Sequence, residues 1–404
     1  MASEKPKTNK KYIINLLVLV IITIGTLILL LKDDFNEVVD TVLRADLWYI
    51  FLIIMAMVIY YLIEGLALTI FAKLYRRSFK FYKGVLNGMI GTFFSGITPS
   101  ASGGQFAQAY AFKKQGIKIS NSASILFMHF IVYELVLVLY VLVTLIFRFN
   151  DFTTIMPYTE IAGYRLSFLA LTLIGFGINA AVIGGLFFMA YSKLFHRLVL
   201  VHGINLLAKL KIIKNKEKVQ RQAELQVSMF RREFTKLLTN FKVLVIVAFL
   251  QFIKLTVFYS VPYLAAKAVG ANVDFGESLI MASYLYMITS FFPIPGASGG
   301  SEAFFVIMFK RMISIPGFSL DSIITSIMLI WRFATFYIGL IVGAFVVIFY
   351  RESGTKEFVT MANPKIVLTG EISKITISDE DYTNINKKEE NEEEIIQEDG
   401  ENEE

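Results

Sequence analysis

The residue types best suited to binding chemistry lie in two short glycine-rich breaks within apolar segments. The first reads Gly96-Ile-Thr-Pro-Ser-Ala-Ser-Gly-Gly104, and the second reads Phe292-Pro-Ile-Pro-Gly-Ala-Ser-Gly-Gly300. Proline and glycine together stop one helix and start another. The free N–H groups and partial positive charge at a helix start suit a phosphate, and glycine lets the backbone approach a ligand closely. The two breaks therefore predict a phosphate cradle built from both loops.

Several side chains in and beside the breaks are candidates for this cradle. Ser102 can cap the half-helix that follows, because Gln105 stands at the capping-box spacing, and Ser298 can cap the second. Glu302 lies in the first turn of its half-helix, where it complements the helix dipole or binds a cation of the substrate. The alternative is that proline and glycine only let two hairpins cross. The full candidate set is Ser102, Gly103, Gly104, Gln105, Ser298, Gly299, Gly300 and Glu302.

Four charged residues, Glu64, Glu134, Lys254 and Arg332, lie inside apolar stretches. Such residues are costly in a bilayer, so they usually face a cavity or a partner. Lys254 and Arg332 can bind a phosphodiester, while Glu64 or Glu134 can hold a cationic aminoacyl group. Structural ion pairing is the equal alternative. Glu134 and Arg332 lie in the helices that follow the two breaks, so we expect them to come together.

The remaining composition argues against catalysis. Cysteine is absent, which excludes thiolate metal sites and cysteine nucleophiles, and the chain holds only three histidines. We expect no catalytic residue, metal site or cofactor. His129 and Asn179 each lie in an apolar helix. We interpret them as satisfied core residues, with a proton relay as the alternative.

The chain as a whole is too apolar for a soluble protein. Its 404 residues are 55% hydrophobic and 18% charged, with a mean hydropathy of +0.61. Apolar runs near 20 residues predict six spanning helices, the first being too long for a signal peptide. A short amphipathic helix at 33–46 is expected to lie at the membrane surface. The six predicted spans are 12–31, 48–72, 120–147, 166–191, 243–269 and 322–350.

Lysine and arginine predict the orientation. The base-rich segments 1–11, 73–83 and 192–242 belong in the cytoplasm, and the base-poor segments 32–47 and 148–165 belong outside. Both termini are then cytoplasmic. The loop 192–242 holds twelve bases against three acids, so we expect it to contact anionic lipids rather than nucleic acid.

Two apolar segments, 84–115 and 277–311, do not fit a simple span. Each limb beside the break is about 10–16 residues, or roughly 15–24 Å of helix, which is short of a ~30 Å hydrocarbon core. Two re-entrant hairpins of half-helices are the economical interpretation. The breaks are also copies of each other, because five identities fall at one offset of 196. These identities pair Pro99, Ala101, Ser102, Gly103 and Gly104 with Pro295, Ala297, Ser298, Gly299 and Gly300.

Three predicted spans separate the two hairpins, so the hairpins should open to opposite sides of the membrane. This arrangement is an inverted-topology repeat, which many secondary transporters share, with the site near the midplane where broken helices meet. We therefore expect an all-α polytopic membrane protein with its transmembrane domain at 12–350. The tail 351–404 carries 16 acids against 6 bases and is expected to be cytoplasmic and largely disordered.

These motifs resemble a known family. Thr98-Pro-Ser-Ala-Ser-Gly-Gly-Gln105 with Ala109-Tyr-Ala-Phe-Lys-Lys-Gln-Gly116, Phe292-Pro-Ile-Pro-Gly-Ala-Ser-Gly-Gly-Ser-Glu-Ala303 and the Arg332 helix resemble its signatures. The family is the flippase-like transmembrane region of the lysylphosphatidylglycerol synthases, the multiple peptide resistance factors. The resemblance covers about residues 10–350. Many members carry an arginine after the first glycine-rich turn, where this chain reads Gln105-Phe-Ala-Gln108.

The resemblance implies a multi-pass protein of the bacterial plasma membrane that moves a phospholipid between leaflets. Lysylphosphatidylglycerol or another polar-headed lipid is the implied substrate, and antibiotic resistance is the implied context. The first alternative is phosphatidylglycerol lysyltransferase, but only 54 residues follow the last span, so we expect the transferase domain to be missing. The second alternative is an accessory protein of envelope glycolipid or polyprenyl-phosphate assembly. A separate transferase or glycosyltransferase is the implied protein partner.

Overall fold

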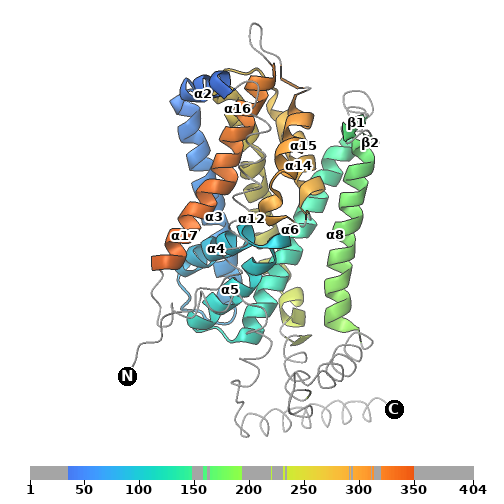
Figure 1. The fold of residues 1–404 in the computed structure, drawn as a ribbon. Helices are drawn as coiled ribbons and strands as arrows, with labels where there is room; N and C mark the ends of the chain where they lie inside the picture. The colour runs from blue at the N-terminus through green and yellow to red at the C-terminus, as the bar shows by residue number, and fades with distance from the viewer. Residues whose placement is uncertain are drawn as a thin grey trace, which may run out of the picture.

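The protein is an all-α polytopic membrane protein with one short β-hairpin among its described residues (Figure 1). The predicted N-terminus 1–11, the first predicted span 12–31 and the tail 351–404 lie outside the described residues, as does most of the loop 192–242. The computed structural model describes residues 35–147, 158–161, 164–192, 220, 231–232, 234–290, 292, 294–310, 312–313 and 320–349.

Five described helical stretches are long and apolar enough to cross a membrane, and they correspond to five of the six predicted spans. Two of them are composite: α12 continues into α13 past Ser260, and α16 continues through the π-helical turn η4 into α17. The five stretches are α3 (Leu47–Lys73), α6 (Ile119–Phe147), α8 (Phe168–Tyr191), α12 (Phe241–Tyr259) with α13 (Val261–Ala268), and α16 (Leu320–Arg332) with η4 (Phe333–Tyr337) and α17 (Ile338–Phe349).

Short polar side chains start several of these helices by accepting backbone N–H groups that a first turn leaves free. Asp46 accepts from Trp48 N at the start of α3, at 2.8 Å. Ser167 caps α8, directly after β1 (Tyr158–Ile161) and β2 (Tyr164–Ser167) form an antiparallel hairpin. The fourth span therefore begins at Phe168, two residues later than the sequence predicts. The predicted surface helix is α2 (Phe35–Leu43), which packs against α16.

Two pairs of short helices form the predicted hairpins. The first pair is α4 (Phe81–Gly96) and α5 (Ser102–Lys114), and the second is α14 (Phe275–Thr289) and α15 (Gly300–Phe309). The four helices are 16, 13, 15 and 10 residues long, so none can cross a ~30 Å hydrocarbon core alone. The partners within each pair pack against each other.

The two hairpins enter the bundle from opposite ends, as the inverted repeat predicts. Arg76, just after α3 ends, donates to Gln115 O beyond α5, at 2.6 Å, so the first hairpin opens at this end. Asp46, just before α3 begins, donates its N–H to Ala268 O, at 2.8 Å, and α14 starts soon after Ala268. In Figure 1, α4 and α5 occupy the lower half of the bundle, and α14 and α15 occupy the upper half.

Glycines let the first hairpin approach the bundle closely. A Cβ on Gly84 of α4 would overlap Thr69 Oγ1 and Gly65 O of α3, and a Cβ on Gly65 would stand 2.6 Å from Val85 Cα. Small residues at such crossings are the usual means of packing helices in lipid, where apolar surface alone gives no driving force. In the second hairpin, Phe305 of α15 stacks on buried Trp331 of α16, with centroids 4.6 Å apart.

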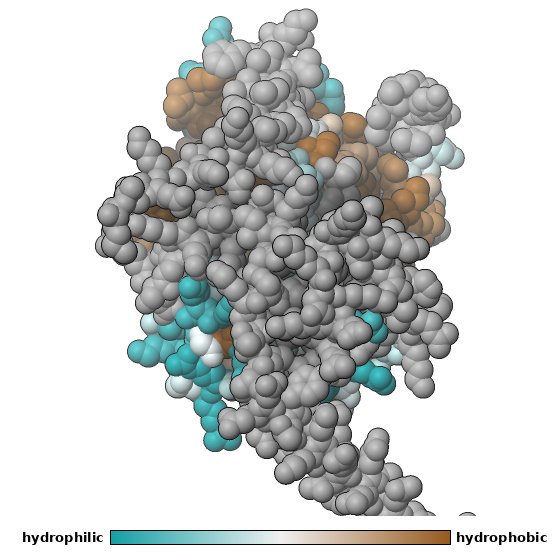
Figure 2. Space-filling model, turned by 60° about the horizontal axis from the view of Figure 1, so that its bottom comes forward, coloured by the Kyte–Doolittle hydropathy of each residue, from teal (hydrophilic) through white to brown (hydrophobic). Residues whose placement is uncertain are grey.

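The lower end of the bundle is basic. Figure 2, which brings this end forward, shows the visible described residues there as hydrophilic, with hydrophobic residues farther up the flanks. The connection between α3 and α4, the end of α5 and the start of α6 supply the charge. Its exposed or half-buried bases include Lys73, Arg76, Arg77, Lys80, Lys83, Lys113, Lys114 and Lys118.

Candidate functional site: the junction of two helix breaks

The two breaks share a turn with a left-handed alanine at its end. The short 3-10 turns η1 (Pro99–Ala101) and η3 (Pro295–Ala297) fall at the offset of 196 that relates the sequence copies. Ala101 has a φ of 53° and Ala297 a φ of 52°, both in the left-handed region that residues other than glycine rarely adopt. The repeat is therefore present in the structure as well as in the sequence. The two turns pack against each other where the hairpin tips meet.

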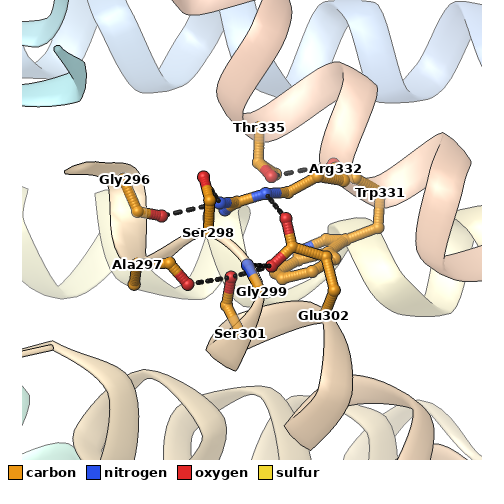
Figure 3. A network of polar contacts seen from close by, with 9 residues as sticks. All are labelled: Gly296, Ala297, Ser298, Gly299, Ser301, Glu302, Trp331, Arg332 and Thr335. Carbon is orange, nitrogen blue, oxygen red and sulfur yellow. Dashed lines mark hydrogen bonds and ion pairs between the residues drawn. The ribbon is translucent and has the colours of Figure 1, made fainter. Parts of the chain in front are cut away.

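Arg332, from the end of α16, points into the second break (Figure 3). Its Nε donates to Glu302 Oε1 at 2.7 Å. Its Nη2 donates to Gly296 O at 2.6 Å and to Ser298 Oγ at 3.3 Å. The arginine is only 5% exposed. One guanidinium therefore joins the turn η3, the start of α15 and the last turn of α16, using the fixed fork of donors that distinguishes arginine from lysine.

Glu302 completes this network from the first turn of α15. Its Oε2 accepts from Gly299 N at 2.8 Å, which is the dipole-complementing role expected for this residue. Ser301 Oγ also donates to Oε2, at 2.8 Å. The prediction that Ser298 caps this helix is wrong, because Gly299 is the capping residue and Ser298 Oγ faces Arg332 instead. Ser298 has an extended backbone, and Gly299, with a φ of 85°, is the last non-helical residue before α15. Ser298 is therefore one residue too far from the helix to be its N-cap.

The contacts described above use only part of the Arg332 guanidinium. An arginine has five N–H donors, and the contacts above use the one on Nε and the two on Nη2. Among the described residues, no acceptor makes a hydrogen bond with Nη1. The guanidinium also lies over the ring of Phe336, with Cζ 4.2 Å from the centroid. Phe336 belongs to η4, a π-helical turn that starts directly after Arg332. Such turns are rare and often occur at functional sites.

The first break is built differently. Thr98 caps α5, because Gly103 N donates to Thr98 Oγ1 at 2.8 Å. The predicted cap, Ser102, is already the first residue of α5 and donates to Pro99 O at 2.9 Å, so that prediction is wrong. Pro99, Ala101 and Ser102 are exposed, and Gln105 is half-buried. The first break therefore presents an open, uncharged helix start, whereas the side chains of Glu302 and Arg332 occupy the second.

The glycines after the breaks face protein on the side where a Cβ would stand. At Gly103 a Cβ would meet Thr98 Cγ2 at 2.6 Å, and at Gly104 it would overlap Ser95 Oγ and lie 2.8 Å from Gly91 O. At Gly300 it would overlap the ring of Phe292. Close packing of each hairpin thus accounts for these three glycines. Of their N–H groups, that of Gly103 is already bound to Thr98 Oγ1.

Two of the other three intramembrane charges, Glu64 and Lys254, form an ion pair away from the breaks. Lys254 Nζ of α12 donates to Glu64 Oε2 of α3 at 2.7 Å, which is the structural ion pair that was the alternative to substrate binding. Glu134 is 3% exposed, and its Oε2 has no hydrogen-bond partner among the described residues. The expected meeting of Glu134 and Arg332 does not occur as a contact, because Arg332 pairs with Glu302.

His129 and Asn179 are buried, as interpreted from the sequence. His129 Nε2 lies 2.9 Å from Gln251 Nε2 and 3.4 Å from Glu64 Oε2. Asn179 Nδ2 donates to Gly175 O in its own helix, at 3.0 Å. Three features of these sites are not predicted from the sequence: the Thr98 cap, the contact of Gln251 with His129 and the π-helical turn after Arg332. A threonine directly before a proline is a pattern typical of an N-cap, so Thr98 could have been predicted. The contact of Gln251 and the π-helical turn depend on helix packing.

Comparison with protein families gives one match. The sequence profile described as the lysylphosphatidylglycerol synthase TM region matches residues 13–343. A search of curated proteins gives no match. The matched range includes both breaks, all five described spanning stretches up to Gly343 in α17, and the two buried charge clusters.

Proposed function

The chain belongs to the family of the lysylphosphatidylglycerol synthase transmembrane region, and on that premise we propose that it moves a phospholipid between the two leaflets of a membrane. The family name relates the chain to membrane lipid metabolism. The specific proposal is that the polar head group passes through the junction of η1 and η3 while the acyl tails stay in lipid. Lysylphosphatidylglycerol is the first substrate to test.

The observation that carries the proposal is Arg332 Nη1, which holds two N–H donors without a described protein acceptor beside two packed helix breaks. A phosphodiester oxygen accepts a charge-assisted hydrogen bond from such a donor. Nη2 of the same guanidinium binds Gly296 O of η3, and η3 packs against η1, so the free donors and the exposed start of α5 belong to one region. Backbone broken at membrane depth is tolerated where protein or a wet cavity surrounds it.

The arrangement also supports a transported rather than a permanently bound lipid. Arg332 is already paired with Glu302, so the site has no large net positive charge that would hold an anion tightly. The phosphate contact is common to all phospholipids and gives no choice between head groups. Ser102 and Gln105, at the open first break, are the candidates for that choice. Gly104 is the candidate for an N–H contact, because the N–H of Gly103 is bound to Thr98 Oγ1.

We place the basic end of the bundle in the cytoplasm of a bacterial cell, following the positive-inside rule. Both termini and the acidic tail are then cytoplasmic. Anionic lipids are the proposed partners of the loop 192–242 and of the described bases at the same end. A separate soluble transferase is the proposed source of an aminoacylated lipid.

The test is lipid movement in liposomes that contain the purified protein and fluorescent lipids of different head groups. We expect movement by the wild type and at least a tenfold loss in Arg332→Gln, because the phosphate loses its paired donors. Arg332→Lys should also be impaired, since a compact ammonium lacks the fixed planar fork that binds Glu302, Gly296 O and a phosphate from separate nitrogens. The matched control is Arg44→Gln, which removes an exposed arginine paired with Asp40 on α2 and should move lipid normally. Equal rates for all four proteins, each present at the same level, would contradict the proposal.

A further inference from the structure

The lower end of the bundle carries a basic face around the open end of the first hairpin. The sequence between Glu64 and Glu134 holds eight lysines and arginines and no acid. These bases lie in the connection from α3 to α4, at the end of α5 and just before α6. Lys236 extends the face, because its Nζ lies over the ring of Tyr75, 5.7 Å from the centroid. The exposed members on the first hairpin and its connections are Lys73, Arg76, Arg77, Lys80, Lys113 and Lys118.

The acids outside the membrane-spanning segments gather at the opposite end, as far as the structure describes the chain. Glu160 of β1 and Asp46, which caps α3, lie there, and so do the acids of α2. Asp274 and Asp321 lie at the starts of α14 and α16. The basic face therefore has no acid within the part of the lower end that the structure describes. A face of one charge sign attracts a segment of the other sign.

Helix α17 brings the chain back to this face. A Cβ on Gly339 would stand 3.2 Å from Thr92 Cγ2, and a Cβ on Gly343 would stand 2.9 Å from Met89 O. The helix therefore runs antiparallel to α4, toward the basic face (Figure 1). Both helices rise by ~1.5 Å per residue. Phe349, six residues past Gly343, thus lies level with the first turn of α4.

The sequence after α17 divides sharply by charge. Residues 351–388 hold six acids and six bases, whereas residues 389–404 hold ten acids and no base. The segments 1–11 and 192–242, which we also expect at this end, carry more bases than acids. Residues 389–404 are therefore the segment whose charge complements the basic face. The intervening chain is long enough, because an extended residue covers roughly 3.3–3.6 Å.

We propose that residues 389–404 dock on the basic face and that anionic lipids compete with them for it. Exposed ion pairs are individually weak and are screened by salt. Here many pairs form at once, and the covalent link makes each contact intramolecular, which favours contacts that a separate peptide would not hold. Arg76 joins the end of α3 to the end of α5 at this face, so the docked segment lies beside the open end of the first hairpin. This inference does not depend on lipid movement.

The docking is tested by a distance within one chain. Because the chain has no cysteine, Ser78→Cys on the face and Gln397→Cys in the segment accept one spin label each. Double electron–electron resonance then measures their separation in phosphatidylcholine vesicles, with labelled protein diluted in unlabelled protein. We expect a population of short distances at low salt. It should shrink at least about threefold at 1 M salt, where the Debye length is ~3 Å.

Two matched variants test the charge of the segment. The first replaces six of the ten acids by glutamine, and the second replaces the six acids of 351–388 by their amides. Acidic residues contribute little to membrane topology, so neither variant should change insertion. We expect the short distances to fall at least about threefold in the first variant and to persist in the second. Equal distances in all three proteins, or a loss confined to the second variant, would overturn the docking. The six residues of the first variant are Glu389, Glu390, Glu392, Glu393, Glu394 and Glu398.

The competition is tested by changing the vesicles. In vesicles of phosphatidylcholine and phosphatidylglycerol in equal parts, anionic head groups attract the same lysines and arginines. We expect the short distances to fall at least about threefold relative to phosphatidylcholine alone, at the same low salt. Short distances that persist unchanged in the anionic vesicles would overturn the competition. Their absence from both kinds of vesicle would overturn the docking itself.

Discussion

The two helix breaks share one short turn and differ in chemistry. Both have a proline-led 3-10 turn ending in an alanine with a φ near 52°. In the second break, Glu302 and Arg332 fill the turn with a buried ion pair and four further hydrogen bonds. In the first break, a single Thr98 hydroxyl caps the helix, and the turn is exposed.

The offset of 196 shows where the copies have diverged. Glu302 corresponds to Phe106, which is 64% exposed, and Arg332 corresponds to Val136. The repeat thus supplies the geometry of a broken helix twice and the charge only once. We therefore propose that the second break supplies a fixed, preorganised set of donors. A ligand would then enter at the open first break.

The largest expected difference between the two hairpins is the side of the membrane from which each one enters. Lys80 precedes α4 and Asn272 precedes α14, and both residues are exposed. Because the chain has no cysteine, Lys80→Cys and Asn272→Cys each introduce a single label site. A membrane-impermeant thiol reagent should label each variant from one side only, and from opposite sides. Labelling of both from the same side would break the inverted repeat.

The next contrast concerns the two ion pairs that join α15 and its following turn to α16. Arg332→Gln leaves Glu302 charged and buried, so it should lower the free energy of unfolding by about 3–5 kcal/mol. Lys310→Gln removes the partner of Asp321 at the exposed end of the same two elements and should cost less than about 1 kcal/mol. Thermal unfolding in detergent measures both changes.

The double variant Arg332→Gln/Glu302→Gln separates stability from transport. Removing both charges should recover most of the stability, because no buried charge is left unpaired. Lipid movement should stay impaired, since the Nη1 donors are still missing. If the double variant moves lipid at the wild-type rate, Arg332 has only a structural role.

The smallest expected effect tests whether the two breaks are alike. Ala101→Gly and Ala297→Gly each relieve a left-handed conformation that glycine adopts freely. Each should raise the free energy of unfolding by up to about 1 kcal/mol, and both should do so with the same sign. Opposite signs in thermal unfolding would show that the shared φ values do not reflect a shared frame.

The spans and hairpins of this protein are predicted well from sequence patterns, because the thickness of the bilayer sets the length that a spanning helix needs. Apolar length gives the spans, and short limbs around proline and glycine give the hairpins. The predicted capping residues, Ser102 and Ser298, are wrong because the positive φ of Ala101 and of Gly299 determines where each helix begins. Such a φ cannot be read directly from the sequence. Thr98 rather than Ser102 became the cap for this reason.

Partners of buried charges were harder to predict than the charges themselves. Glu64, Glu134, Lys254 and Arg332 stand out in apolar runs, but pairing depends on how helices rotate against each other. Lys254 reaches Glu64 across 190 residues of chain, and Arg332 reaches Glu302 within its own half of the repeat. The repeat suggested Glu134 for Arg332, yet the helices place Glu302 closer to the guanidinium.

The central claim is that a lipid phosphate binds the free donors of Arg332. Solid-state NMR with ¹⁵N-arginine protein in ³¹P-containing lipid measures this contact directly, and Arg332→Lys identifies the signal. A hydrogen bond with an N–O distance of about 2.8 Å places Nη1 about 4 Å from phosphorus. We predict ³¹P dephasing of the Arg332 Nη signal at that distance, stronger than for exposed Arg44. An Arg332 Nη signal with no ³¹P dephasing, in liposomes where lipid movement is measurable, would contradict the account.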